Sequence, residues 1–364
     1  MSNTRWKDYS LKGNVAADTT QLTEDRFEGE VEESWFSADI DRKTLKQLIK
    51  RSDSVAIRDF SLWIGLLLVT GIAAFFAWGT LLAIPLFFIY GVLYSAADHR
   101  HHELSHGTPF KNRKLNDIFY HLCAFMTLRE GNYYRWSHTR HHTHTIVVGK
   151  DPEIGAPRPP NRLAIYSDFF FMNSGIILFR MIFRHAMGKL TEDGKHFVPA
   201  QEVPKVFFAA RVYVAIFAAI ILLCIATASI LPAMFIVLPR FYGGFFSQLF
   251  NMSQHTALAE DVTDHRLNCR TIIMNPVFDF LYANMNYHIE HHMFPMVPYY
   301  RLPELHELIK DQCPPAYPGI WAAWKEIIPA MNRQVKDPEW FVQRPLPAAN
   351  DANNSQAATI NAAA

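Results

Sequence analysis

The sequence lacks several features that would assign it to a common class of protein. Its 35 basic and 34 acidic residues leave a formal net charge of +1, so no basic surface for nucleic acid is predicted. Its four cysteines have no CxxC spacing, and free thiols are expected rather than disulfides or a cysteine zinc site. The first residues, MSNTRWKDYSLKGNV, contain no apolar signal-peptide core, so membrane insertion is expected to use internal segments.

Long apolar runs are abundant. Half of the 364 residues are hydrophobic, including 28 Phe and 8 Trp. Residues 60–80 read FSLWIGLLLVTGIAAFFAWGT without a charge, and the apolar residues 81–97 follow almost directly. Because a helix rises ~1.5 Å per residue, about 20 residues cross a hydrocarbon core of about 30 Å. These two runs predict a transmembrane hairpin, and residues 212–230 and 231–250 predict a second one.

The distribution of charge predicts which side of the membrane the polar segments occupy. Two hairpins place both ends of the chain and all histidine-rich segments on one side, where nearly all Lys and Arg also lie. Positive charge marks the cytoplasmic face. We therefore expect an all-α, multi-pass membrane protein with four spans and a cytoplasmic, histidine-rich catalytic cap. Residues 163–183 are apolar but interrupted by Asp168, Asn173 and Ser174, which favours an interfacial or re-entrant helix over a fifth span.

Three regions follow from this reading. Residues 1–55 form a cytoplasmic N-terminal segment with one amphipathic helix around Arg42–Arg51. Residues 56–345 form the membrane domain. Residues 346–364, rich in Ala and Asn, are predicted to be a disordered tail.

Three histidine clusters lie on the polar side of apolar segments. They read His102-Glu-Leu-Ser-His106, His138-Thr-Arg-His141-His142 and His288-Ile-Glu-His291-His292. Residues at i, i+3 and i+4 share one face of a helix. Imidazole is a good ligand for iron, zinc and copper. Three clusters in one chain predict a site that holds more than one metal ion.

Two other classes of protein share part of this pattern. The run HELSH matches the HExxH motif of zinc proteases, in which His102 and His106 would bind zinc and Glu103 would be the general base. That alternative leaves both HxxHH clusters unexplained. A histidine-rich metal transporter would need ionisable groups through its membrane spans, and these spans have few.

The order hairpin, HxxxH, HxxHH, hairpin, HxxHH over residues 60–305 resembles the membrane-bound fatty acid desaturase and hydroxylase superfamily. HIEHHMFPMVPYYRLPEL at 288–305 is particularly similar to the last histidine box of acyl desaturases. The resemblance implies two iron ions (Fe2+/Fe3+), O2 as co-substrate, and a separate electron donor (a ferredoxin, rubredoxin or cytochrome) with its reductase. It implies desaturation at an unactivated C–H bond of a fatty acyl or lipid chain, with hydroxylation and oxidative decarboxylation as alternatives.

The same resemblance implies a ligand set. It comprises the histidines of the three boxes: His102, His106, His138, His141, His142, His288, His291 and His292. In related acyl-CoA desaturases a further histidine follows an asparagine by four residues after the fourth span. His255 and Asn251 match that spacing, which implies a ninth histidine ligand and an asparagine that binds through water. The first box is HxxxH rather than the HxxxxH of many acyl-CoA desaturases, which weakens an assignment to acyl-CoA substrates.

One arginine is predicted inside a span. Arg240 follows Pro239 midway along the fourth apolar run, where inserting an arginine costs about 2.5–3.5 kcal/mol. It is expected to pair with helix carbonyls or a buried carboxylate, or to extend its charged end to the membrane interface. The alternative is that it holds an anionic part of the substrate, with Gly243 and Gly244 making room.

Charged residues beside the clusters give two further expectations. Exposed Arg135 and Arg140 would steer an acidic electron donor, or alternatively anchor the protein to anionic lipid. Four carboxylates are expected to accept the far N–H of ligating histidines, with ordinary interfacial charge as the alternative: Asp98, Glu103, Asp261 and Glu290. His265 and His306 are read as isolated surface or core histidines.

Overall fold

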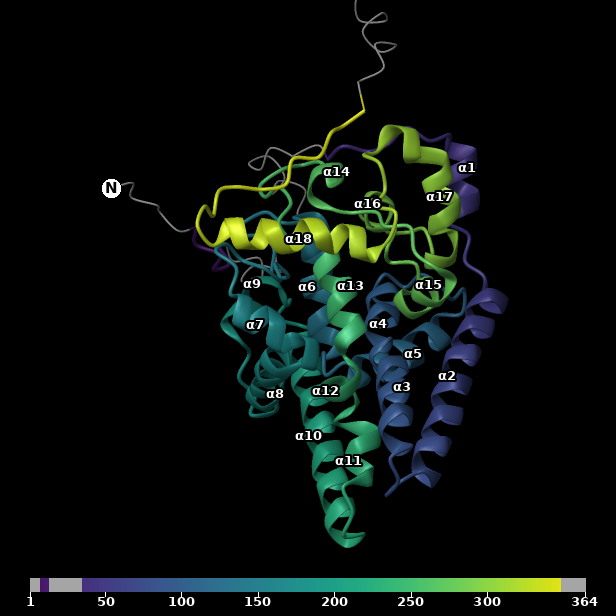
Figure 1. The fold of residues 1–364 in the computed structure, drawn as a ribbon. Coiled ribbons are helices and arrows are strands. Elements are labelled where there is room, and N and C mark those ends of the chain that lie inside the picture. Colours follow the sequence, from purple (N-terminus) through teal and green to yellow (C-terminus); the bar gives the residue numbers. More distant parts are fainter. Residues whose placement is uncertain (1–6, 13–34, 348–364) are drawn as a thin grey trace, which may run out of the picture.

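Helices make up the regular secondary structure of the computed structural model, which describes residues 7–12 and 35–347. Within these residues there are two isolated β-bridges and no strand. Short helices gather at one end of the molecule, and two longer helical hairpins extend away from them (Figure 1). Nearly all of the predicted tail at 346–364 lies outside the described residues.

The first predicted hairpin is formed by α2 (Asp53–Phe76) and α3 (Ala83–Ser95). The Ser52 side chain caps the start of α2 by accepting the N–H of Val55. The two helices lie side by side and join through a turn at Gly79, whose φ of +85° suits glycine (Figure 1). Large apolar side chains of α2, among them Leu68, Val69 and Phe76, remain exposed and form a surface that suits lipid.

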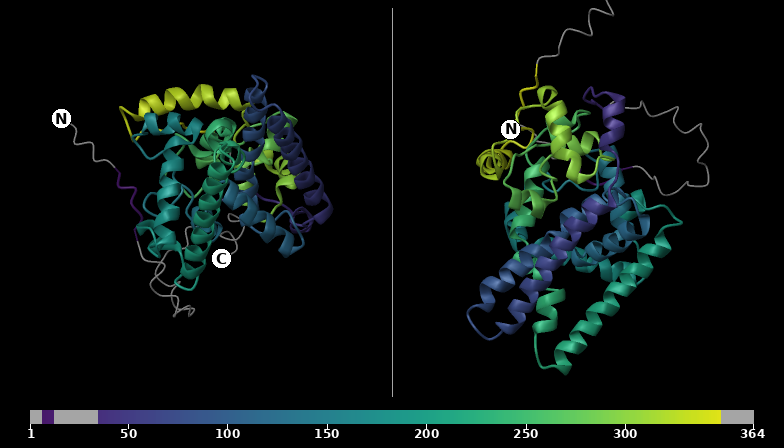
Figure 2. Two further views of the ribbon diagram at one scale, coloured as in Figure 1. Left: turned by 90° about the horizontal axis from the view of Figure 1, so that it is seen from below. Right: turned by 90° about the vertical axis from the view of Figure 1, so that its right-hand side faces the viewer.

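The second predicted hairpin has one continuous and one broken arm. The continuous arm is α10 (Val203–Ala226). The returning arm is divided into α11 (Leu231–Ile236), α12 (Pro239–Gly243) and α13 (Phe245–His255). Pro239 has no N–H and therefore cannot continue the hydrogen-bond ladder of α11. The two hairpins diverge from the shared end of the molecule (Figure 2).

Among the described residues, α2 and α10 are each long and apolar enough to cross a membrane alone. The returning arms are shorter, because α3 has 13 residues and the second arm is broken. Both hairpin turns lie at the same end of the molecule, away from α14, α16 and α17 (Figure 1). Four spans with a cytoplasmic cap remain a prediction.

Residues 163–183 do not form a straight fifth span. They lie within α7 (Arg162–Ser167), η2 (Asp168–Phe170) and α8 (Met172–Ala186), and the chain bends by 82° at the break. Phe171 at the bend has a φ of +54°. The Asp168 carboxylate accepts the Ser174 N–H at 2.6 Å and its hydroxyl at 2.8 Å. The polar residues that interrupt the apolar run thus stabilise the bend. By length and composition the bent segment fits either a broken span, which would be a third candidate span among the described residues, or a re-entrant loop.

The remaining helices build the end of the molecule that carries the histidines. The predicted helix near residue 42 is present as α1 (Arg42–Leu48). The others are α4 (Ala97–Ser105), α5 (Arg113–Met126), α6 (Gly131–Thr143), α9 (Glu192–Phe197), α14 (His265–Asn268), α15 (Pro276–Tyr282), α16 (His288–Met293), η3 (Tyr299–Arg301), α17 (Leu302–Ile309), η4 (Lys310–Gln312) and α18 (Ile320–Gln334). Trp324 of α18 donates to the carbonyl of Leu249 in α13 at 3.0 Å, which ties these two helices together.

A glycine contact joins the two hairpins. A Cβ added to Gly243 of α12 would lie 2.0 Å from the carbonyl carbon of Gly91 in α3, so the two backbones touch. Gly243 therefore makes room for α3, and the expectation that it makes room for a substrate was wrong. Tyr90 and Tyr94 of α3 donate to carbonyls of the broken arm at 2.9 and 2.7 Å. These bonds satisfy carbonyl groups that the break leaves without helical partners.

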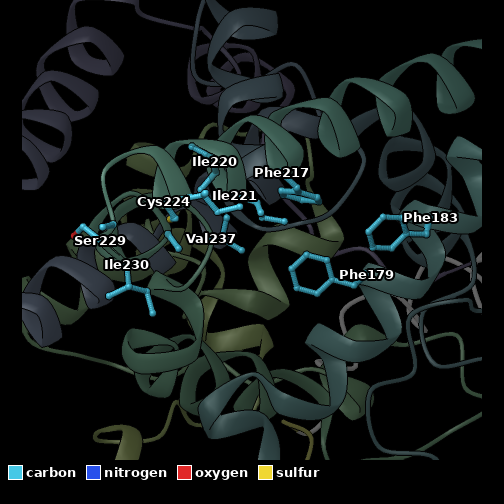
Figure 3. Close-up of a pocket in the computed structure, with 12 residues that line it drawn as sticks. Phe179, Phe183, Phe217, Ile220, Ile221, Cys224, Ser229, Ile230 and Val237 are labelled. Atoms are coloured by element: carbon cyan, nitrogen blue, oxygen red, sulfur yellow. The ribbon is translucent and has the colours of Figure 1, made fainter.

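An apolar groove of about 500 Å³ lies between α8, α10 and the start of α11. Figure 3 shows Phe179 and Phe183 from α8 on one side of it and Phe217 from α10 nearby. No charged residue and no histidine lines the groove. Its lining suits contact with lipid chains.

Candidate metal centre

Four helices carry the histidines of the three boxes and His255. The first box lies on α4 and at its C-terminal end, the second on α6 and the third on α16, while His255 ends α13. Helical spacing puts the members of each box on one face, and these faces point toward one another. All nine histidines predicted as ligands therefore come together in two neighbouring groups, and their role as ligands remains a prediction.

The first group has five members: His102, His106, His138, His142 and His291. Each offers a ring nitrogen, and these nitrogens all lie within 4.8 Å of one another. The Nε2 atoms of His106 and His142 are each 3.1 Å from Nε2 of His138.

His291 provides a test of whether this group fits a metal ion. Its side chain is fully buried, yet neither ring nitrogen has a hydrogen-bond partner within residues 7–12 and 35–347. Leaving a buried polar atom unpaired costs about 1–3 kcal/mol. A metal ion bound at the centre of the group would take one of these nitrogens as a ligand, so the residues fit such an ion.

The second group lies beside the first. His141, His255 and His292 offer ring nitrogens within 4.8 Å of one another. His288 joins them, because its Nε2 is 2.9 Å from Nε2 of His255 and 3.1 Å from Nε2 of His292. The rings of His142 and His292 stack across the two groups with centroids 4.2 Å apart. The arrangement suits two metal ions close together.

Burial keeps most of these imidazoles in the form that binds metal. Burial, reinforced by neighbouring histidines, lowers the pKa of His138, His142 and His291 well below the ordinary value. A neutral imidazole has a free lone pair for a metal ion. Burial also acts to lower the pKa of His141, but the Asp151 carboxylate more than offsets it and the pKa is raised.

Two carboxylates orient ligands of the second box. Asp151 Oδ2 lies 2.8 Å from Nδ1 of His141, and Glu153 Oε2 lies 3.0 Å from Nδ1 of His138. An N–H donated to a carboxylate fixes the tautomer and leaves Nε2 free for the metal. His255 uses a backbone carbonyl instead, with Nδ1 2.8 Å from the Asn268 oxygen. Asp151 and Glu153 were missed, because nothing in the sequence distinguishes them from other loop carboxylates.

The expectation that the four flanking carboxylates bind ligating histidines was wrong. Each carboxylate has other partners. Asp98 pairs with Arg240, and Glu103 accepts hydrogen bonds from the Thr108 hydroxyl and the Tyr299 N–H. Asp261 accepts hydrogen bonds from Lys7 and the Val148 N–H, and Glu290 accepts them from His306 and Thr271. Nearness in sequence does not place a side chain on the face of the helix that carries the ligands.

Two histidines read as isolated lie near the site. His265 is buried, stacks on Trp35 and forms a group with Cys269 and His292. Burial raises the pKa of the Cys269 thiol well above its usual range. Nδ1 of His306 in α17 lies 2.5 Å from Oε1 of Glu290, and this contact links α17 to α16.

A sequence model described as fatty acid desaturase matches residues 80–324. The chain belongs to the fatty acid desaturase family. A comparison with curated proteins found no match. In this desaturase-family chain, the matched region contains all three boxes, α13 and the bent segment of α7, η2 and α8.

In this desaturase-family chain, Arg240 pairs with a buried carboxylate. This is the structural role expected for it from the sequence, as opposed to a role in binding an anionic substrate. Its Nη2 lies 3.2 Å from Asp98 Oδ2, and its guanidinium lies over the ring of Phe171. Asn251 donates to the same oxygen at 2.9 Å, and Ser247 donates to it at 3.1 Å. A role for Asn251 as a ligand through water remains a prediction.

A cavity of about 480 Å³ adjoins the histidines. It lies between α6, α8, α13 and the loop at 146–158. His102, His138 and His255 form part of its wall, so a molecule bound in it would lie beside both metal groups.

Proposed function

We propose that the protein is an O2-dependent, non-haem diiron oxidoreductase that attacks an unactivated C–H bond of a fatty acyl or lipid chain. Desaturation is the reaction we favour. The observation that carries the proposal is the pair of neighbouring histidine groups in a chain of the fatty acid desaturase family. Both groups adjoin a cavity large enough for a substrate.

The roles of the residues follow from their positions. His102, His106, His138, His142 and His291 would hold one iron ion, and His141, His255, His288 and His292 the other. When bound, the two ions would supply the activation of O2 that removing hydrogen from an alkyl carbon requires. Asp151 and Glu153 hold two of the imidazoles in the ligating tautomer and add negative charge near the metal.

Hydroxylase and oxidative decarboxylase activities of the same superfamily remain alternatives. These reactions differ from desaturation in how the substrate lies relative to the metal. The zinc protease alternative receives no support. Its general base would be Glu103, whose Oε1 accepts hydrogen bonds from Thr108 at 2.6 Å and from the Tyr299 N–H at 3.0 Å. These bonds engage Oε1 in structural contacts, and a single zinc site would leave most of the grouped histidines without a role.

We further propose four spans with the histidines on the cytoplasmic side, and a separate ferredoxin, rubredoxin or cytochrome as electron donor. Two hairpins that turn at the same end support this topology. Arg135 remains a candidate for donor docking because its side chain is 42% exposed. Arg140 is a poorer candidate, since it donates to the carbonyls of Lys150 and His196 and so holds loops together.

Product analysis tests the reaction. The full chain is expressed in a host that lacks the activity, and lipids and free acids are analysed by mass spectrometry. Loss of two mass units from one product class supports desaturation, and gain of sixteen supports hydroxylation. The matched control is His291→Ala, which removes a candidate ligand whose ring nitrogens make no hydrogen bond to another described residue. A product formed equally by the control would contradict the proposal.

A further inference from the structure

A chain of four aromatic rings runs through the interior beside the metal centre. It begins at Tyr120 of α5, continues through His101 of α4 and Tyr134 of α6, and ends at His138, a member of the first metal group. The successive ring centroids lie 4.8, 4.3 and 5.1 Å apart, spacings at which aromatic rings are in contact. Each of these residues is at most 6% exposed. The rings therefore form a continuous buried path that ends at a candidate metal ligand.

His101 takes part in neither metal group and in no hydrogen bond of its side chain. Both of its ring nitrogens are buried, and neither has a hydrogen-bond partner among the residues that the structure describes. A buried polar group without a partner is costly, and an apolar side chain would avoid that cost. What His101 does provide is an aromatic ring that joins Tyr120 to Tyr134.

The outer end of the ring chain reaches the surface at Arg135 of α6. Its guanidinium lies over the Tyr120 ring, 4.5 Å from the centroid, and its side chain is 42% exposed. Arg135 also lies 3.6 Å from Asp117 of α5. Arg113 and Lys114 share one face of α5 with Asp117, because residues three and four apart are neighbours on a helix. A protein that covers Arg135 would therefore lie directly over Tyr120.

A basic surface surrounds Arg135. It comprises the charged residues of 111–117 and two charged side chains that bind this segment: Lys111, Arg113, Lys114, Asp117, Asp53 and Arg135. Asp53 belongs to it because its Oδ1 accepts the N–H groups of Lys111 and Asn112. Four positive and two negative groups leave a formal charge of +2. Such a surface attracts and orients an acidic protein.

A second stack of rings reaches the other metal group. Trp35 stacks on His265 with centroids 4.3 Å apart, and the His265 centroid lies 5.1 Å from that of His292. Arg266, which follows His265 in the chain, is only 13% exposed and pairs with Asp264. This end of the second stack thus offers an acidic protein less free positive charge, which favours the first path.

We propose that an acidic one-electron carrier protein docks on the basic surface, and that its electrons reach the first metal group through the rings of Tyr120, His101 and Tyr134. Each carrier molecule loses one electron to the metal at His138, and the rings are unchanged by the transfer. Two such electrons, with two protons and two hydrogens taken from the substrate, convert one O2 to two molecules of water. The proposal rests on the proposed function, which needs an external donor, and assigns that donor a docking site and a path.

Docking is measured without turnover, on the full-length, detergent-purified protein loaded with zinc. The probe is an acidic plant-type ferredoxin, titrated by calorimetry at low salt. Arg135→Gln should raise the Kd about two- to fivefold, as expected for the loss of one exposed charge pair. Arg184→Gln is the matched control, because Arg184 is 44% exposed and lies on α8, and its Kd should be unchanged. An Arg135→Gln protein that binds ferredoxin as tightly as the unmodified protein would overturn the docking site.

Electron transfer is measured on the iron-loaded protein without O2, from the absorbance of reduced ferredoxin at saturating concentration. His101→Leu should lose most of the rate of ferredoxin oxidation, because leucine fills the space but removes the central ring. His101→Phe restores an aromatic ring and should keep most of the rate. Trp35→Leu, which interrupts the second stack, should leave the rate unchanged. Dithionite, a small reductant that needs no docking, should reduce the iron of the unmodified and His101→Leu proteins alike.

A His101→Leu protein of normal iron content that accepts electrons from ferredoxin as fast as the unmodified protein would overturn the path. A rate lost in Trp35→Leu instead would also overturn it. So would a His101→Leu protein that dithionite reduces equally slowly, since His101 would then act by packing the metal site. Failure of the proposed function is a different result, because it would appear in the unmodified protein as a failure to hold two iron ions or to be reduced by dithionite.

Discussion

Replacing Arg240 by glutamine should destabilise the protein more than it changes substrate affinity. Both partners of the Arg240–Asp98 pair are buried, with side chains 6% and 5% exposed. Breaking a buried ion pair by removing one partner costs about 3–5 kcal/mol, because the other charge is left buried without its partner. Asp98 would keep Ser247, Asn251 and the more distant Arg129. We therefore expect a loss of about 3 kcal/mol for Arg240→Gln, at the lower end of that range.

Asp98→Asn should cost more, about 4–5 kcal/mol, because it removes a carboxylate that Arg240 and Arg129 share. The double variant should be less destabilised than the sum of the two single changes, since its members contact each other. The assay is the free energy of unfolding of the purified protein, with metal content measured on the same samples. An Arg240→Gln protein of normal stability that binds anionic substrates more weakly would refute this reasoning and favour direct substrate binding.

Four other outcomes follow from named contacts. Gly243→Val should reduce the folded fraction on size-exclusion chromatography, because the new side chain would clash with the backbone of α3, whereas Gly65→Val on an open face should not. Burial raises the pKa of Glu130 from 4.5 to about 7, so the folded protein keeps this proton and the contribution of Glu130 to the free energy of unfolding should fall as pH rises from about 4.5 to 7. The buried histidines, whose pKa values are lowered, act in the opposite direction, so the test is the difference between Glu130→Gln and the unmodified protein. This difference should shift in favour of the variant as pH rises, and a difference that does not change with pH would contradict the prediction. Asp151→Asn should weaken metal affinity by roughly 10–100-fold, measured by chelator competition, because His141 loses the carboxylate that orients it; Asp261→Asn is the control. Turnover with subsaturating acidic ferredoxin should fall as salt rises toward about 0.15 M, where the Debye length is ~8 Å, and a rate insensitive to salt would favour lipid anchoring by Arg135.

The sequence was informative where local periodicity and chemistry agree. The apolar run at 60–80 predicted α2, and the spacing of the boxes predicted that their imidazoles share helix faces. His255 could be added only through the family resemblance, because a lone histidine at a helix end has no pattern of its own. In the structure, Nε2 of His255 lies 2.9 Å from Nε2 of His288.

The sequence was less informative about contacts between distant segments. Asp98 lies next to the first box, but its partner is Arg240, 142 residues away. Asp151 orients His141 because the loop after α6 folds back, and no periodic pattern encodes that fold. Pro239 predicted a local break in the fourth apolar run. The sequence did not show that Tyr90 and Tyr94 of α3 donate hydrogen bonds to the carbonyls at the break.

Metal analysis of the purified full-length protein is the most direct test of the central claim. The protein is expressed with iron and zinc both supplied, and bound metal per chain is measured by mass spectrometry. The account predicts about two iron ions per chain, falling in His291→Ala and unchanged in His196→Ala, a histidine outside both groups. One zinc ion per chain, or iron content unaffected by loss of His291, would contradict a diiron centre held by these histidines.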